Sequence, residues 1–237
     1  MALRTLLLLL TLSALSGACR STPGVTQAPG QYDENGVHVV CHSSSACRVC
    51  ALYRKARPYI VRLESSSGDG AGVVLTPDGK VATNAHVVGR ARSVNIHTYD
   101  DHTYVGKVVA TSDQDDLAVV SMRAEDRTWA VPVLRRGAPP KVGSKVYVIG
   151  RPLGLGWTVT RGTISKYYLD GMKTLIETDA DIATGNSGGA MLDGKGQLLG
   201  IVTTRIDGRG AENVAFARPT EALIAFLTRL GSPESEP

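Results

Sequence analysis

The chain has 237 residues, a formal net charge of +4 and a pI near 8.9, which is enough length for one large domain or two small ones. Hydrophobic residues make up 43% and charged residues 20%, as is ordinary for a globular protein that can build a core. Basic and aromatic residues do not alternate, which argues against a nucleic-acid-binding surface. With 26 glycines and few aromatic residues, the composition favours many short strands over long helices.

The first 18 residues have the layout of a secretory signal. Arg4 precedes an uncharged, leucine-rich run over residues 5–15, and small residues follow up to Ala18. A helix that crosses a bilayer needs about 20 apolar residues, so this run is too short for a membrane-spanning anchor. The sequence therefore predicts an exported protein.

Cys19 directly follows this segment. The string LSGAC resembles the lipobox of bacterial lipoproteins, in which the cysteine is lipidated, although Ser16 stands where a large apolar residue is usual. The alternative is a plain signal peptide that is cut near Ala18. We favour lipidation of Cys19, which would tether the protein to a membrane face. The expected location is periplasmic, or that of a membrane-tethered lipoprotein of a bacterium.

Residues 19–53 are expected to form a flexible tether, because they are turn-rich and no hydrophobic period runs through them. In an oxidising compartment a disulfide is the favoured use of the cysteines, and a metal site is the alternative. The residues that bear on this choice are Cys41, Cys47, Cys50, His38 and His42. The spacing leaves the pairing open, and no metal site is expected. All four cysteines of the chain precede residue 54, so a cysteine nucleophile is not expected in the domain that follows.

Residues 54–231 are predicted to form one folded domain, because from residue 54 the hydrophobic pattern is that of strands. Turn residues separate the runs, and the Pro-Asp-Gly string at 77–79 is typical of a hairpin. The strands expected first cover residues 59–66, 72–76, 80–83, 93–99, 104–111 and 117–122. Six short strands suit a small closed barrel, because closure leaves no exposed sheet edge.

A connector over residues 124–143 leads to a second set of strands. These are expected at residues 145–150, 158–168, 173–178, 189–192, 197–204 and 213–217. The string EALIAFLTRL at 221–230 spaces its apolar residues as one face of a helix, and Gly231 ends it. The predicted fold is all-β, with two six-stranded antiparallel β-barrels, a C-terminal helix and a short tail over residues 232–237.

The strongest chemical signal is the string TGNSGG, which contains Ser187. A serine hydroxyl becomes a useful nucleophile when a base removes its proton and N–H groups stabilise the resulting oxyanion. Glycines on both sides let the backbone turn sharply, so the N–H groups of Gly185 and Ser187 are expected to form an oxyanion hole. Taken alone, the string is equally well explained as a glycine-rich turn between two strands.

A candidate base and a candidate carboxylate precede this serine in the chain. His86 lies in the string TNAHVV at the end of a strand, and a free histidine titrates near pH 6.5, so it can act as a base at neutral pH. Asp116 opens the apolar strand DLAVV, where its carboxylate can orient the histidine and stabilise the imidazolium. Asp113 and Asp115 are alternatives by proximity, but they fall in the loop before that strand.

The order His, Asp, Ser, with the strings TNAHVV, DLAVV and TDADIATGNSGGAML, resembles the HtrA/Deg-type trypsin-like serine proteases. The resemblance covers about residues 54–230. It implies a chymotrypsin-like double β-barrel, with His86, Asp116 and Ser187 as catalytic residues in the cleft between the barrels. Acyl transfer to water through these residues needs no metal or cofactor.

Two features depart from the pattern of that family. Many members carry PDZ domains after the protease domain, and the residues after 231 leave no room for one. Thr184 stands where a proline is common, which could loosen the oxyanion loop without removing a donor. Some members form trimers through their N-terminal segments, so the resemblance admits a homo-oligomer without deciding for one.

Polypeptides are the expected substrates, lying extended along a strand edge. The residues expected at the substrate site are Asp181, Thr184, Val202 and Thr203. In chymotrypsin-like folds the residue six places before the nucleophile lies at the floor of the primary specificity pocket, and here it is Asp181. A buried carboxylate there would favour Arg or Lys before the scissile bond. The alternatives are that Asp181 pairs with a nearby arginine, or that the site prefers the small apolar residues usual for HtrA-like proteases.

Two other classes of function fit the sequence less well. An α/β-type esterase requires a Gly-x-Ser-x-Gly string followed by an acid and a histidine, whereas no histidine follows Ser187 in this chain. A catalytically silent protein that keeps the protease fold and binds extended peptides stays open as the alternative, although all three catalytic positions are filled.

Overall fold

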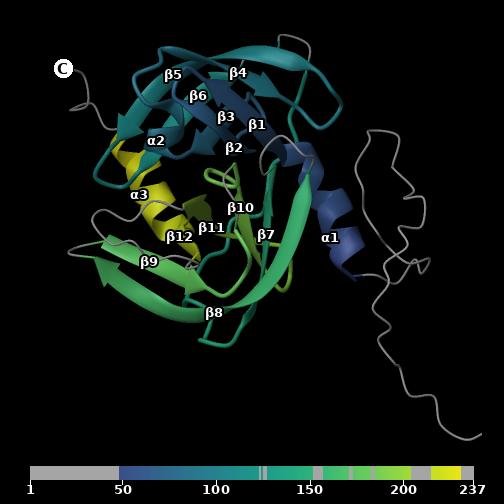
Figure 1. Ribbon diagram of the computed structural model, residues 1–237, viewed down its shortest axis with the longest axis vertical. Coiled ribbons are helices and arrows are strands. Elements are labelled where there is room, and N and C mark those ends of the chain that lie inside the picture. Colours follow the sequence, from purple (N-terminus) through teal and green to yellow (C-terminus); the bar gives the residue numbers. More distant parts are fainter. Residues whose placement is uncertain are drawn as a thin grey trace, which may run out of the picture. The chain divides into compact units, whose positions relative to one another are not determined.

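The computed structural model describes residues 48–122, 124, 127–151, 157–170, 173–182, 185–203 and 215–230 (Figure 1). The expected signal, Cys19, most of the expected tether and the C-terminal tail lie outside these residues. In the part of the chain that is described, no helix is long and apolar enough to cross a membrane.

The first barrel, drawn in blue and teal in Figure 1, is a closed antiparallel sheet. A 3₁₀ helix, η1 (Arg57–Tyr59), leads into its strands, which are β1 (Ile60–Ser65), β2 (Gly68–Val74), β3 (Lys80–Thr83), β4 (Ser93–His97), β5 (Thr103–Ser112) and β6 (Leu117–Met122). Neighbouring strands follow the order β1-β2-β3-β6-β5-β4, and the barrel closes because β4 pairs with β1. The predicted first barrel is therefore confirmed.

The second barrel, drawn mainly in green, has the same topology. Its strands are β7 (Lys145–Gly150), β8 (Thr158–Asp170), β9 (Lys173–Thr178), β10 (Ala190–Asp193), β11 (Leu198–Thr203) and β12 (Ala215–Pro219). Neighbours follow the order β7-β8-β9-β12-β11-β10, and β10 pairs with β7 to close the sheet. The predicted double barrel is thus confirmed. The structure adds that the two barrels share one order of strands.

One strand differs clearly from its expected bounds. β2 begins at Gly68, whereas the sequence predicted a strand from residue 72. Gly68 and Asp69 are exposed, and they join the sheet through pairing with Ser65 and Glu64 of β1. Gly70 and Ala71 are buried, but the small side chains of this segment give it no apolar run that a sequence pattern would detect.

Helix α1 (Arg48–Ala56) occupies residues 48–53, which the sequence analysis assigned to the flexible tether. The physical reason is burial, since Leu52, Tyr53 and Ala56 pack into the same core cluster as the first barrel. The helix is one short amphipathic segment with basic residues on its exposed face, so it contains too few turns for a clear hydrophobic period.

Cys50 on α1 is disulfide-bonded, which is the use that the sequence analysis favoured for these cysteines. The other cysteines of the chain lie outside the described residues, and so does the partner of Cys50. His38 and His42 lie outside as well. Over the described ranges, no group of three or more His, Cys, Asp or Glu side chains is arranged to hold a metal.

Helix α3 (Thr220–Leu230), drawn in yellow, follows β12 directly and packs against β11 and β12 (Figure 1). Leu223 and Phe226 are buried in a core cluster that also contains Leu63 of the first barrel and Ile149 of the second. The predicted C-terminal helix is confirmed. Because both barrels and α3 share this core, loops from the two barrels are held together at one junction.

Candidate active site

His86 lies on α2 (Ala85–Val88), a single helical turn between β3 and β4. Asn84 before the turn is extended, and Val87 and Val88 are buried. Buried Ala85 before His86 and buried Val87 and Val88 after it hold the backbone of the turn, while the His86 side chain keeps 20% of its surface exposed. The imidazole is therefore anchored at its base and open to solvent at its tip.

Asp116 meets His86 from the turn between β5 and β6. His86 Nδ1 lies 2.9 Å from Oδ1 and 3.0 Å from Oδ2 of Asp116, and the His86 backbone N–H donates to Oδ1 at 3.1 Å. Thr203 of β11 donates its hydroxyl to Oδ2 at 2.9 Å. Asn84 Nδ2 donates to the Asp116 carbonyl oxygen at 2.9 Å. Donors from both barrels thus converge on this one residue.

The environment of Asp116 keeps its carboxyl ionised. Burial alone would raise its pKa, but the hydrogen bonds and charge of His86 and the Thr203 hydroxyl outweigh burial and lower the pKa below its usual value. An ionised carboxylate at Nδ1 favours the tautomer in which Nδ1 carries the proton, so Nε2 can accept one. This arrangement can perform general base catalysis.

The loop that contains Ser187 precedes β10 and is hydrogen-bonded to both barrels. The N–H of Ala71 in β2 donates to the Ser187 carbonyl oxygen at 2.7 Å, and the Gly188 N–H donates to the Val202 carbonyl oxygen at 2.8 Å. Gly188 has a φ of 86°, and a Cβ there would collide with the Ala71 carbonyl oxygen. Glycine at this position lets the loop approach the first barrel. Gly185 is also left-handed, with a φ of 97°.

The structure brings the three candidate catalytic residues to the junction of the barrels. His86 and Asp116 come from the first barrel, and Ser187 comes from a second-barrel loop that is bonded to β2. Asp113 and Asp115, the alternatives by proximity, do not contact His86 in any hydrogen bond among the described residues. Asp115 instead accepts hydrogen bonds from Ser112 and from an arginine on α3.

Two residues expected at the substrate site, Val202 and Thr203, lie on β11. Thr203 donates to Asp116, a contact that the sequence analysis missed because it assigned Thr203 to substrate binding. Val202 is buried, and its N–H and carbonyl groups bond to Gly189 and Gly188. The role of Val202 in substrate binding stays a prediction.

Asp181 is exposed, whereas the sequence analysis expected a buried carboxylate, and its carbonyl oxygen accepts a hydrogen bond from the Thr160 hydroxyl at 2.7 Å. Its carboxylate makes no hydrogen bond or ion pair with any residue in the described ranges. Thr184, the fourth residue expected at the substrate site, lies outside the described residues. The role of Asp181 in specificity therefore stays a prediction.

A profile of the trypsin-like peptidase domain matches residues 70–201, from β2 to β11. Among curated proteins, the chain is 33% identical over 170 residues to the periplasmic pH-dependent serine endoprotease DegQ of Escherichia coli, covering 69% of this chain and 37% of DegQ. It is 32% identical over 170 residues to the serine endoprotease DegS of Escherichia coli, covering 68% of this chain and 48% of DegS.

A solved structure supports the same relationship. The crystal structure of the serine endoprotease from Yersinia pestis matches with a TM-score of 0.67 and 31% sequence identity, covering 77% of this chain and 66% of that chain. The chain spans 37% and 48% of the lengths of DegQ and DegS. Since the profile match extends over more than half of the chain and the double barrel agrees with it, the chain belongs to the trypsin-like peptidases of the HtrA type.

Proposed function

We propose that this chain is a serine endopeptidase with a catalytic triad of His86, Asp116 and Ser187. The observation that carries the proposal is the 2.9 Å contact between His86 Nδ1 and Asp116, at the junction where the Ser187 loop is bonded to the first barrel. The family match and the lowered pKa of Asp116 support it.

The proposed reaction proceeds through an acyl-enzyme. Nε2 of His86 takes the proton of Ser187 Oγ as Oγ attacks the peptide carbonyl carbon, and the N–H groups of Gly185 and Ser187 stabilise the oxyanion. The imidazolium, held by ionised Asp116, then protonates the leaving amine, and the C–N bond breaks. Water attacks the acyl-enzyme with His86 as the base, which releases the carboxylic acid and restores Ser187.

The proposed substrates are exported or unfolded polypeptides, bound in an extended conformation. The signal-like first 18 residues and the name of DegQ as a periplasmic protease support an exported location for this chain. Lipidation at Cys19 would add a tether to a membrane face, and residues 54–231 would be the protease domain.

Two measurements on the purified full chain test the proposal. We expect it to degrade reduced, unfolded casein, and we expect a fluorophosphonate reagent to label it once, at Ser187, as located by mass spectrometry of the labelled peptide. A folded chain that neither cleaves casein nor reacts with the reagent would contradict the proposal and favour a peptide-binding protein. Labelling at another residue would contradict the assignment of Ser187.

A separate experiment tests whether Asp181 gives the enzyme a preference for a basic residue before the scissile bond. If this exposed carboxylate contacts the residue before the scissile bond, kcat/KM for an Arg peptide is expected to exceed that for the matched Val peptide by about 10-fold or more. Asp181→Asn is expected to remove that preference while leaving the rate on the Val peptide unchanged. Equal or faster cleavage of the Val peptide by the wild type would contradict a role for Asp181.

A further inference from the structure

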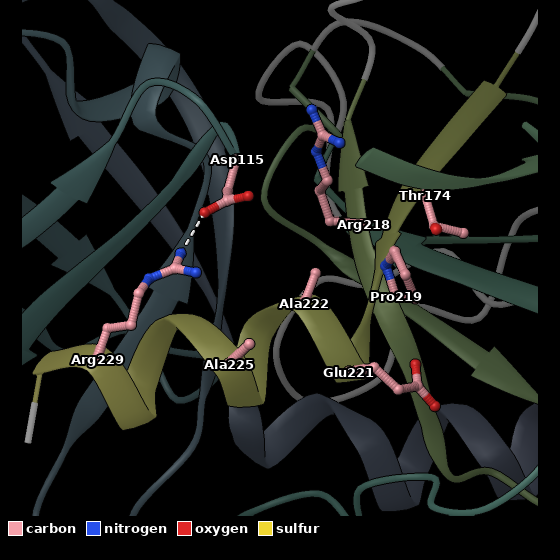
Figure 2. Close-up of a pocket in the computed structure, with 8 residues that line it drawn as sticks. All are labelled: Asp115, Thr174, Arg218, Pro219, Glu221, Ala222, Ala225 and Arg229. Carbon is pink, nitrogen blue, oxygen red and sulfur yellow. Dashed lines mark hydrogen bonds and ion pairs between the residues drawn. The ribbon is translucent and has the colours of Figure 1, made fainter. Parts of the chain in front are cut away.

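Two consecutive aspartates in the turn between β5 and β6 each contact the C-terminal half of the chain, one through a hydrogen bond and the other through an ion pair. Asp116 accepts a hydrogen bond from Thr203 of β11 at 2.9 Å. Asp115 forms an ion pair with Arg229 near the end of α3, with Arg229 Nη2 2.5 Å from Oδ2 of Asp115. Figure 2 shows this Arg229 side chain reaching from the helix to the turn. The turn that bears the catalytic carboxylate is therefore held at two adjacent points.

Asp115 is also bonded within its own turn. The Ser112 hydroxyl donates to Oδ2 of Asp115 at 3.0 Å, and the Asp115 N–H donates to the Ser112 hydroxyl oxygen at 3.1 Å. The Asp116 N–H donates to the Asp113 carbonyl oxygen at 3.3 Å. These short-range hydrogen bonds make the turn a compact unit. A displacement of Asp115 would therefore also displace the backbone of Asp116.

Asp116 has a backbone conformation that its surroundings must maintain. Its φ is 50°, in the left-handed region, where a residue with a side chain is disfavoured. In this conformation the carboxylate accepts hydrogen bonds from the His86 side chain and from the His86 backbone N–H. Loss of an external contact on the turn would let this backbone relax away from that geometry.

A hollow of about 260 Å³ lies beside the ion pair, between α3 and the end of β12 (Figure 2). The charged groups that line it are Asp115, Arg218, Glu221 and Arg229. No other ion pair joins α3 to the first barrel among the described residues. Arg229 is thus the residue of α3 that pairs with the turn, and Arg218 of β12 is the other cation that lines the hollow.

We propose that Arg229 is a positioning residue, which acts through Asp115 to hold the β5–β6 turn so that Asp116 stays aligned with His86. This inference rests on the proposed function of Asp116. The Arg229 side chain is 60% exposed, and exposed ion pairs contribute little to global stability. Loss of the contact is therefore expected to change global stability little, so an effect on catalysis can be measured on a folded protein.

The test compares Arg229→Leu with a matched control. Lys166 and Glu177 form an ion pair between β8 and β9, with side-chain exposures of 56% and 18%, against 60% and 19% for Arg229 and Asp115. Arg229→Leu is expected to lower kcat by about 5-fold with KM within about twofold, because substrate contacts are unchanged. Lys166→Leu is expected to change neither constant. Both variants are expected to shift Tm by less than about 4 °C.

The pH profile separates an effect of charge from an effect of the lost contact, because Arg229→Leu and Asp115→Asn both break the ion pair but change the net charge in opposite directions. Arg229→Leu removes a positive charge beside Asp115, so any effect of charge alone would move the acidic limb of the rate profile to higher pH. Asp115→Asn leaves the Arg229 charge uncompensated and moves the limb down. Asp116, Arg218 and Glu221 are the other charged groups at the turn and hollow, and they are unchanged in both variants.

A spectroscopic measurement separates this inference from the proposed function. The proton on His86 Nδ1, which is hydrogen-bonded to Asp116, is expected to give a downfield NMR resonance without substrate. We expect Arg229→Leu to shift this resonance or to speed the exchange of the proton with water. If the resonance, kcat and acidic limb of Arg229→Leu match those of Lys166→Leu, Arg229 is not a positioning residue. A wild type that fails to cleave casein would overturn the proposed function, while the resonance would still decide the role of Arg229.

Discussion

Replacing Ser187 with alanine is expected to lower kcat by about a millionfold, the largest effect that any single substitution in this chain should have. The change removes the Oγ atom that forms the acyl-enzyme but adds no volume to the loop. Ser187 is buried, and its carbonyl oxygen accepts a hydrogen bond from Ala71, a contact that alanine also makes. The variant is therefore expected to fold and to bind substrate with little change in affinity.

This loss is measured by following the cleavage of a fluorogenic peptide, with samples taken over hours so that the very slow rate of the variant can be detected. The control is Ser93→Ala, which removes an exposed hydroxyl from the first residue of β4 and is expected to keep wild-type rates. Residual activity of Ser187→Ala within about 100-fold of the wild type would show that another group attacks the substrate. Fluorophosphonate labelling should disappear in the same variant.

Replacing Asp116 with asparagine is expected to lower kcat by about 10⁴-fold, the second largest effect. The carboxylate now accepts the His86 Nδ1 proton at 2.9 Å, and an asparagine amide can donate an N–H to Nδ1 instead. The imidazole would then carry its proton at Nε2 and could not take the proton of Ser187. Rates measured across the pH range should stay low wherever wild-type Asp116 is ionised.

Stability as a function of pH provides the control for this substitution. The folded-state pKa of Asp116 is lowered, so its ionised form stabilises the fold above the unfolded-state pKa of about 3.9. That contribution is lost as the pH falls through the lower folded-state pKa. The free energy of unfolding of the wild type is thus expected to fall relative to Asp116→Asn below about pH 4. If the difference in free energy of unfolding between the wild type and Asp116→Asn stays the same below about pH 4, the lowered pKa of Asp116 is contradicted.

Strand positions are the part of the fold that the sequence predicted best. The bounds of β3, β6, β7 and β9 agree with expectation at both ends, because alternating burial and turn residues are properties of neighbours in the chain. The same local reasoning selected His86, Asp116 and Ser187, since each lies at the edge of a strand or in a glycine-rich turn. Their catalytic roles stay predictions.

The sequence by itself therefore determined the positions of the strands along the chain, the C-terminal helix and the identity of the candidate catalytic residues. Only the tertiary structure decided the contacts that support them. Thr203 lies 87 positions from Asp116, and Arg229 lies 114 positions from Asp115. No local pattern marks such a pair, because the contact exists only after two closed barrels and α3 have packed around one core.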